Sequence, residues 1–106
     1  MINNTVLVGR MTKDPELRRT GSGKAVTSFT LTVNRAFKQD GQPDADFIRC
    51  VTWNKQAENV ERYCSKGSQV AVIGSIQTRS YDNNQGQKVY VTEIICCQVQ
   101  FLDSKR

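Results

Sequence analysis

Hydrophobic and polar residues alternate along most of the chain, and this alternation predicts β-strands because successive side chains of a strand face opposite sides. The pattern predicts five strands and one short extended piece. The strands cover residues 4–11, 24–37, 46–53, 68–81 and 88–102, and the extended piece covers residues 17–20. Gly9 interrupts the apolar run of the first strand, which indicates a bulge or a sharp bend at that point.

One segment has helical rather than strand periodicity. In residues 55–65, Ala57, Val60 and Cys64 form a single apolar stripe, whereas the charged residues face away from it. Asn54 is predicted to cap the start of this helix, and Gly67 lies just beyond its end. The pattern therefore predicts a short helix that lies over an apolar surface.

Turn-forming segments separate the strands, and the longest of these, residues 38–45 and 82–87, predict hairpin loops. The order of elements predicts an all-β fold, a five-stranded OB-fold Greek-key barrel with one short helix between strands 3 and 4. A β-sandwich is the competing fold, but the single helix at this position and the long strands favour the barrel. Without repeats or a second core pattern, we expect one domain over residues 1–106.

The charge balance gives limited information about a binding partner. Fifteen basic and ten acidic residues give a net charge of +5, which suggests a polyanionic partner but does not identify one. No stretch resembles a signal peptide or a run of about 20 apolar residues, so we expect a cytoplasmic location.

Metal, cofactor and enzyme chemistry find little support in the sequence. The four cysteines, Cys50, Cys64, Cys96 and Cys97, form no C-x-x-C pair, and histidine is absent, so we expect no metal site. We expect these cysteines to be free thiols that serve as small apolar side chains. No G-x-S-x-G or P-loop pattern is present, and we predict neither a cofactor nor an enzyme activity.

The strand over residues 46–53 contains the most informative chemistry. Phe47, Arg49 and Trp53 share one face together with Val51. The two rings stand roughly 20 Å apart at about 3.4 Å per residue, which is the reach of about three splayed bases. A ring can stack on any base, and an arginine between two rings can bind the phosphate of the same strand.

Two other strands repeat the combination of ring and cation. Arg35 and Phe37 share a phase where the second strand ends, and Arg79 and Tyr81 share a phase on the fourth. The alternative is that the rings are ordinary core residues, but this leaves three arginines in phase with rings unexplained. The pattern therefore favours sequence-tolerant binding of single-stranded nucleic acid. The remaining aromatic residues lie in apolar phases and are expected in the core or at an interface: Phe29, Tyr63, Tyr90 and Phe101.

Long motifs in this chain resemble those of the bacterial single-stranded-DNA-binding proteins. The resemblance lies in VLVGRMTKDPELR (6–18), VTSFTLTVNRAF (26–37), ADFIRCVTWNKQAENV (45–60), KGSQVAVIGSIQTRSYDNNQGQKVYVTEI (66–94) and VQFLDS (99–104). It implies an OB-fold homotetramer that wraps and protects single-stranded DNA during replication, recombination, repair or natural transformation. It also implies a nucleoid-associated protein of the cytoplasm.

The same resemblance implies which residues contact DNA. Ring positions of the family match Phe37, Phe47, Trp53 and Tyr81, and basic positions match Arg49, Lys55, Lys66 and Arg79. Phe47 and Tyr81 stand where family members often carry tryptophan, so their stacking area is smaller.

The C-terminal end departs from the family pattern. Many members continue into a flexible tail with an acidic tip that recruits replication and repair enzymes, whereas this chain ends in Lys105-Arg106. We therefore do not expect tail-mediated recruitment from this chain. A short paralogue used in transformation, a removed tail, and a phage or plasmid origin are the open explanations.

Other functions remain as alternatives. An OB-fold could serve as a docking or assembly subunit for other proteins, and replacing Phe47 and Trp53 would then disturb assembly rather than DNA binding. RNA chaperoning of the cold-shock type is disfavoured because the aromatic motifs of that family are missing. Duplex recognition is disfavoured because the one predicted helix is not a basic recognition helix.

Overall fold

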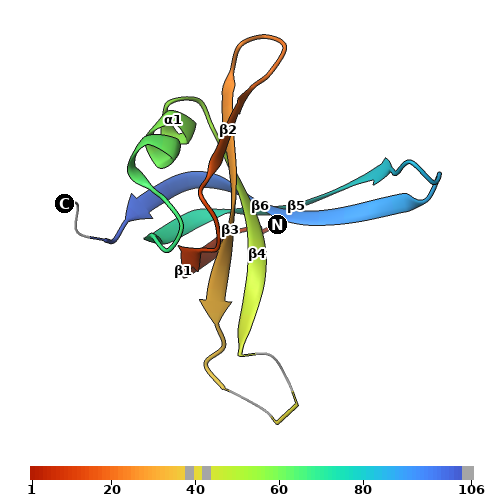
Figure 1. Cartoon of the computed structure of the whole chain (residues 1–106). Coiled ribbons are helices and arrows are strands. Elements are labelled where there is room, and N and C mark those ends of the chain that lie inside the picture. Colours follow the sequence, from red (N-terminus) through yellow and green to blue (C-terminus); the bar gives the residue numbers. More distant parts are fainter. Residues whose placement is uncertain (38–39, 42–43, 104–106) are drawn as a thin grey trace.

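The computed structural model of the chain describes residues 1–37, 40–41 and 44–103. Part of the predicted 38–45 loop and the chain end at Lys105 and Arg106 lie outside these ranges. The elements are β1 (Thr5–Met11), β2 (Glu16–Arg19), β3 (Ala25–Asn34), β4 (Ala45–Trp53), α1 (Asn54–Tyr63), β5 (Gln69–Asp82) and β6 (Lys88–Phe101) (Figure 1).

The strands form a closed ring. Neighbouring strands follow the order β1-β5-β6-β4-β3-β2, and β1 also pairs with β3, so that five strands close on themselves while β2 adds to the edge of β3. All pairings are antiparallel except a short parallel contact between β4 and β6. This arrangement confirms the predicted OB-fold barrel. The short extended piece predicted at residues 17–20 forms an additional strand, β2.

The barrel interior is filled by the apolar phase of the strands. On β3, buried and partly exposed residues alternate along the strand as the sequence pattern predicts. The buried core cluster consists of Met11, Phe29, Leu31, Cys50, Val60, Cys64, Val70, Val72, Ile94 and Cys96.

Three of the four cysteines behave as predicted. All four are free thiols, and Cys50, Cys64 and Cys96 are buried, but Cys97 is exposed, so the expectation of an apolar core residue is wrong there. Burial raises the pKa of the Cys64 thiol to about 11, which keeps it protonated and unreactive near neutral pH. The described residues contain no group of three metal-ligating side chains. They also contain no helix with the length and apolar character needed to cross a membrane.

Hydrogen bonds fix α1 against the barrel. The predicted stripe is confirmed, since Ala57 and Val60 are fully buried. The hydroxyl of Thr27 on β3 donates to the carbonyl of Ala57 at 2.8 Å. The Gln56 side chain donates to the Thr52 hydroxyl at 2.6 Å and accepts from the Val99 N–H at 2.9 Å, which ties the helix to β4 and β6.

The predicted cap of the helix is wrong. Trp53 is the N-cap residue, and no side chain caps the helix, whereas Asn54 is the first helical residue and has a φ of +62°. The chain turns sharply between β4 and α1, and asparagine is one of the few residues other than glycine that tolerates this left-handed backbone. Gly67 also does not end the helix, because Cys64 is the C-cap and the Gly67 N–H donates to the carbonyl of Met11 at 2.8 Å.

Gly9 allows the ring to close. A Cβ atom added at Gly9 would lie 2.5 Å from the carbonyl oxygen of Thr32 on β3, so only glycine lets β1 approach β3 this closely. Gly74 has the same role at the bulge between β5 and β6, where an added Cβ would overlap the backbone of Ile95. The bend predicted at Gly9 is therefore a site of close backbone contact.

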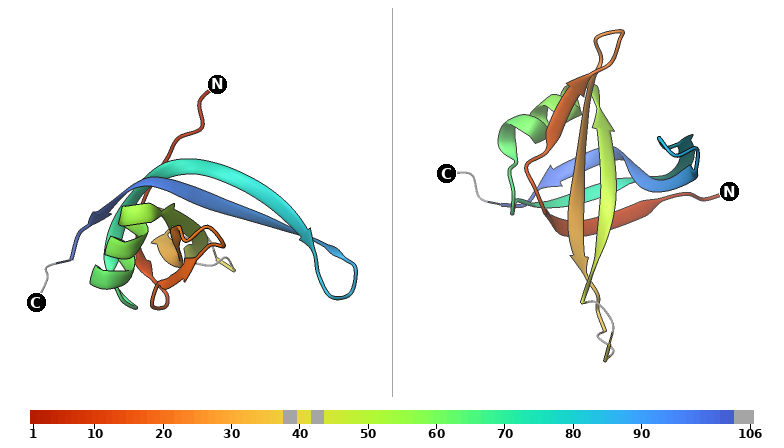
Figure 2. Two further views of the ribbon diagram at one scale, coloured as in Figure 1. Left: turned by 90° about the horizontal axis from the view of Figure 1, so that it is seen from above. Right: turned by 45° about the vertical axis from the view of Figure 1, so that its right-hand side comes forward.

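Hairpins extend from the barrel in different directions. Figure 1 shows the β2–β3 and β3–β4 hairpins at opposite ends and the β5–β6 hairpin projecting sideways. In Figure 2, β5 and β6 arch over the barrel together and continue well beyond it. The projecting part of β5 is exposed on both faces from Ile76 onward, because no core lies beneath it.

We predict that Gly9→Ala destabilises the protein by about 1–3 kcal/mol, because the added methyl group meets backbone atoms that cannot move independently. The measurement is the free energy of unfolding from urea denaturation. Gly21→Ala is the matched control, since an added Cβ at Gly21 has no neighbour within 4 Å. Equal stability of the two variants would contradict the close contact of β1 with β3.

Candidate nucleic-acid interface

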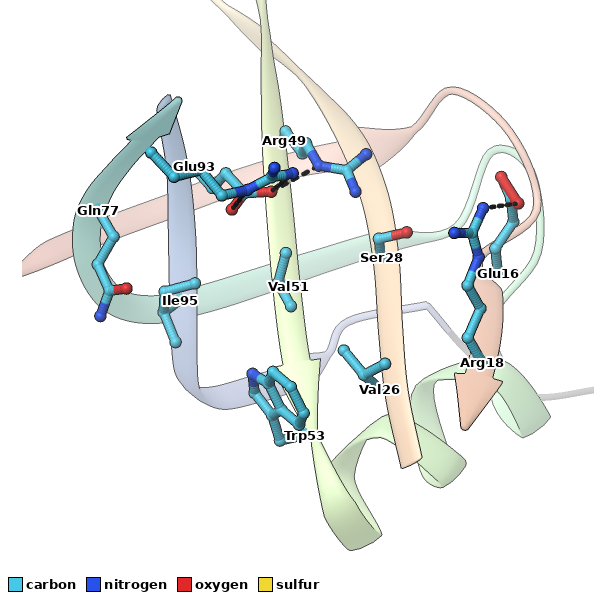
Figure 3. Close-up of a pocket in the computed structure, with 11 residues that line it drawn as sticks. Glu16, Arg18, Val26, Ser28, Arg49, Val51, Trp53, Gln77, Glu93 and Ile95 are labelled. Carbon is cyan, nitrogen blue, oxygen red and sulfur yellow. Dashed lines mark hydrogen bonds and ion pairs between the residues drawn. The ribbon is translucent and has the colours of Figure 1, made fainter. Parts of the chain in front are cut away.

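An open groove of about 490 Å³ lies on the outer face of the barrel and is lined by side chains from β2, β3, β4, β5 and β6 (Figure 3). β4 turns Arg49, Val51 and Trp53 toward this groove, whereas Cys50 and Thr52 between them are buried on the other side. The predicted alternation of β4 is thus confirmed. The groove is lined by Glu16, Arg18, Val26, Ser28, Arg49, Val51, Trp53, Gln77, Arg79, Glu93 and Ile95.

A carboxylate joins two of the predicted arginines in the groove. Glu93 on β6 accepts a hydrogen bond from Nε of Arg49 at 2.7 Å and from Nε of Arg79 at 3.0 Å. The Glu93 side chain is 7% exposed, whereas Arg49 and Arg79 are 45% and 51% exposed. Three strands therefore contribute one compact group with two cations and one anion, which we call the Arg–Glu–Arg triad (Arg49, Glu93 and Arg79).

Glu93 is held in its ionised form. Its burial by itself raises the pKa of the carboxyl, but the hydrogen bonds and charges of Arg79 and Arg49 outweigh burial and lower the pKa below its usual value. The triad therefore carries a net charge of +1 near neutral pH, and the outer faces of both guanidinium groups remain open to solvent.

Three predicted rings are exposed on the same side as the triad. Trp53 lines the groove and is 41% exposed, Phe47 on the same face of β4 is 69% exposed, and Tyr81 on the projecting part of β5 is 49% exposed. The Arg79 guanidinium carbon lies 5.9 Å from the centre of the Tyr81 ring, which is within cation–π distance. The structure thus brings together Phe47, Arg49, Trp53, Arg79 and Tyr81.

Arg35 and Phe37 belong to a different part of the molecule. The predicted second strand ends at Asn34 rather than at residue 37, and Phe37 lies in the following bend with 87% exposure. Arg35 makes a two-pronged ion pair with Asp46 at 2.7 and 3.1 Å. This hydrogen bonding lowers the pKa of Asp46 and fixes the base of the β3–β4 hairpin, so the Arg35 guanidinium does not join the triad.

The two predicted lysines lie at opposite ends of the helix. Lys55 is exposed in the first turn of α1, two residues after the groove residue Trp53. Lys66 is exposed beyond the helix end. Its backbone N–H donates a hydrogen bond to the Asp14 carboxylate at 2.8 Å. Asp14 lines a smaller groove of about 170 Å³ that shares Glu16, Ser28 and Arg49 with the larger one. Lys55 and Lys66 are therefore at the margins of the site rather than in it.

The other aromatic residues were expected in the core or at an interface, and Phe29 is the one that lies in the core, at 4% exposure. Tyr63, Tyr90 and Phe101 are 45%, 77% and 38% exposed, and Tyr63 and Phe101 pack against each other with ring centres 6.1 Å apart. These three rings are not part of the barrel core in the single chain.

Glu93 is the main site residue that the sequence analysis missed. It shares its strand face with the apolar residues Val91 and Ile95, and Ile94 follows it. A carboxylate at such a position must find a cationic partner when the strand is buried, and this was the available signal. Glu16 and Gln77 were also missed, since exposed polar residues carry no comparable signal.

We predict that Glu93 contributes stability above about pH 4.3, the usual carboxyl pKa, and that this contribution is lost as the pH falls through its lowered value in the folded state. Glu93→Gln lacks this titration, so its free energy of unfolding should fall less than that of the wild type on acidification. Urea denaturation at neutral and acid pH measures this difference, and parallel pH profiles would contradict it.

Comparison with known proteins agrees with this geometry. Residues 2–102 match the sequence model of the Single-strand binding protein family. The chain is 58% identical over 106 residues to the Single-stranded DNA-binding protein of Enterococcus faecalis, covering 99% of this chain and 56% of that protein. It is 59% identical to the Single-stranded DNA-binding protein of Halalkalibacterium halodurans, covering 99% of this chain and 63% of the relative. It is 58% identical to Single-stranded DNA-binding protein A of Bacillus subtilis, covering 99% of this chain and 62% of the relative.

The chain thus spans less than two thirds of the length of these three relatives, at 56%, 63% and 62%. The match nevertheless extends from β1 to the end of β6, so it includes every strand of the barrel and the whole groove. On this basis, the chain belongs to the Single-strand binding protein family.

Proposed function

We propose that this chain binds single-stranded DNA without sequence preference and without catalysing a reaction. The observation that carries the proposal is the open face on which Phe47, Trp53 and Tyr81 surround the arginines of the triad. The names of the relatives, which describe proteins that bind single-stranded DNA, support the same ligand.

The chemistry of this face suits unpaired nucleotides. Each exposed ring offers a flat surface for one base, and stacking contributes about 1–3 kcal/mol per base whatever the base is. Arg49 and Arg79 present guanidinium groups that can bind phosphate oxygens along the same strand. Because neither contact reads the edges of the bases, binding of this kind tolerates any sequence.

The residues around the groove extend the proposed site. Phe37, on the exposed bend after β3, supplies a further ring beyond Phe47, and Lys55 and Lys66 supply positive charge at the two ends of the helix. Arg35 contributes through its ion pair with Asp46, which holds the hairpin that carries Phe37. Its guanidinium could contact a phosphate only in addition to this ion pair.

We also propose that the chain acts as a homotetramer of single-domain subunits. Val6 and Val8 of β1 are 63% and 49% exposed. They lie opposite Ile73 and Ala71 of β5, so these four residues form an apolar outer face of the sheet. Among the described residues, the Thr5–Gly9 part of β1 pairs only with β5, which leaves its other edge open. An open edge beside an apolar face is suited to contact between subunits.

The cellular role follows from the proposed ligand. A protein that coats single-stranded DNA would protect it during replication, recombination, repair or natural transformation. We place it in the cytoplasm at the nucleoid, where this DNA is found.

Titration with oligo-dT tests the proposed ligand. Trp53 is the only tryptophan of the chain, so we expect its fluorescence to be strongly quenched when a base stacks on it. Binding should weaken as salt rises, because each phosphate contact releases counterions. Unchanged emission and no binding by sedimentation at low salt would exclude the proposed function.

Replacing the rings tests the proposed site. We expect Phe47→Ala and Trp53→Ala each to weaken binding of oligo-dT about 10- to 100-fold, from the loss of about 1–3 kcal/mol of stacking. Fluorescence anisotropy of a labelled oligo-dT measures the affinity, and sedimentation measures assembly. Tyr63→Ala is the matched control, because Tyr63 is exposed to a similar extent as Trp53 but does not line the groove. Loss of assembly with DNA binding retained would instead indicate a protein-docking surface.

A further inference from the structure

A carboxylate in the middle of a groove for a polyanion needs an explanation. Glu93 is nearly buried at 7% side-chain exposure, and it lies directly between two cations that the proposed function assigns to phosphate. Its charge repels phosphate, so a groove optimised only for positive potential would carry a neutral side chain here. The position of the carboxylate, rather than its charge alone, must therefore matter.

Glu93 accepts its hydrogen bonds mainly from the Nε atom of each arginine. Nε of Arg49 donates to one carboxylate oxygen at 2.7 Å, and Nε of Arg79 donates to the other at 3.0 Å. One Nη of Arg79 also reaches the carboxylate, at 3.5 Å. A guanidinium has five N–H donors, so most of the donors of Arg49 and Arg79 remain available on the side that faces solvent.

Neither arginine is held by burial. Both are about half exposed and sit on long side chains that would otherwise sample many rotamers. Glu93 is fixed by its place on β6, directly before the residues Ile94 and Ile95 that pair with β4, and its side chain bonds Arg49 across this contact. It thus provides a fixed acceptor for two long side chains from two different strands, and Figure 3 shows Arg49 and Glu93 together in the groove.

We propose that Glu93 is a positioning residue that orients Arg49 and Arg79 for phosphate before DNA binds. The gain from this orientation exceeds the loss from the repulsion between its carboxylate and the DNA, because the arginines do not have to be ordered during binding. This inference rests on the proposed function and adds a residue that does not itself contact DNA.

Glu93→Gln separates orientation from charge. This substitution keeps the size of the side chain but raises the net charge of the groove by one, and the amide has only one acceptor oxygen for two guanidinium groups. We expect the affinity for oligo-dT to fall about 10-fold and the dependence of log K on log salt to become shallower, as for the loss of about one phosphate contact. Tighter binding with a steeper salt dependence would show that Glu93 only subtracts charge, and it would overturn the proposal.

Glu93→Asp is the second variant and covers the case in which Glu93→Gln folds poorly. Aspartate keeps the negative charge but is one methylene shorter, so it cannot reach both Nε atoms from the same backbone position. Orientation predicts a loss of affinity similar to that of Glu93→Gln, whereas an affinity equal to the wild type would overturn the proposal. Circular dichroism and thermal unfolding define the folded fraction to which each affinity refers.

Introducing Glu93→Gln into a double mutant that lacks both arginines tests whether Glu93 acts through them. In a chain that carries Arg49→Ala and Arg79→Ala, Glu93→Gln should cause no further loss of affinity. A full loss in this background would mean that Glu93 acts by a different route and would overturn the proposal. Failure of the wild type to bind oligo-dT would instead refute the proposed function itself, so the two failures can be told apart.

Discussion

The parallel contact between β4 and β6 is the constraint on which the site depends. It pairs Cys50 with Ile94 and Val51 with Ile95, and it joins the β3–β4 part of the ring to the β1–β5–β6 part. One residue earlier on each strand, Arg49 and Glu93 meet, and the neighbouring strand β5 adds Arg79. The Arg–Glu–Arg triad therefore forms where the two halves of the barrel meet, and it depends on closure of the ring.

Alternation along β4 then separates packing from binding. Cys50 and Thr52 are fully buried on one side, while Phe47, Arg49 and Trp53 remain accessible on the other. Large rings left in water cost hydrophobic free energy that burial would recover, so their exposure favours a ligand that covers them. The outer face of β1 and β5 is a further exposed apolar surface in the described part of the chain, but it carries no ring. The chemistry of the two surfaces differs, because cations accompany the rings in the groove, whereas valines predominate on the outer face.

Two hairpins extend the set of exposed rings beyond the barrel. The β5–β6 hairpin carries Tyr81 away from the barrel, and the β3–β4 hairpin, with Arg35 and Asp46 at its base, carries Phe37 in another direction (Figure 1). The triad at the centre of the groove is thus combined with two outlying rings, Tyr81 on the projecting part of β5 and Phe37 in the bend after β3. This combination fits a long ligand that makes its central contacts at the triad and further contacts with the outlying rings.

Features that depend on local periodicity could be predicted from the amino-acid sequence alone. They include the strands, the apolar stripe of α1 and the shared face of Phe47, Arg49 and Trp53, because the alternation of side chains is a property of the strand alone. Contacts across the barrel could not be predicted in this way, because they depend on how the strands are arranged in the closed ring. The partner of Arg49 lies 44 residues away at Glu93, and the contact of Gly9 with Thr32 exists only in the closed ring. The backbone of Asn54 and the ion pair of Arg35 with Asp46 were likewise set by where strands and helix join, and residue periodicity carries no information about such junctions.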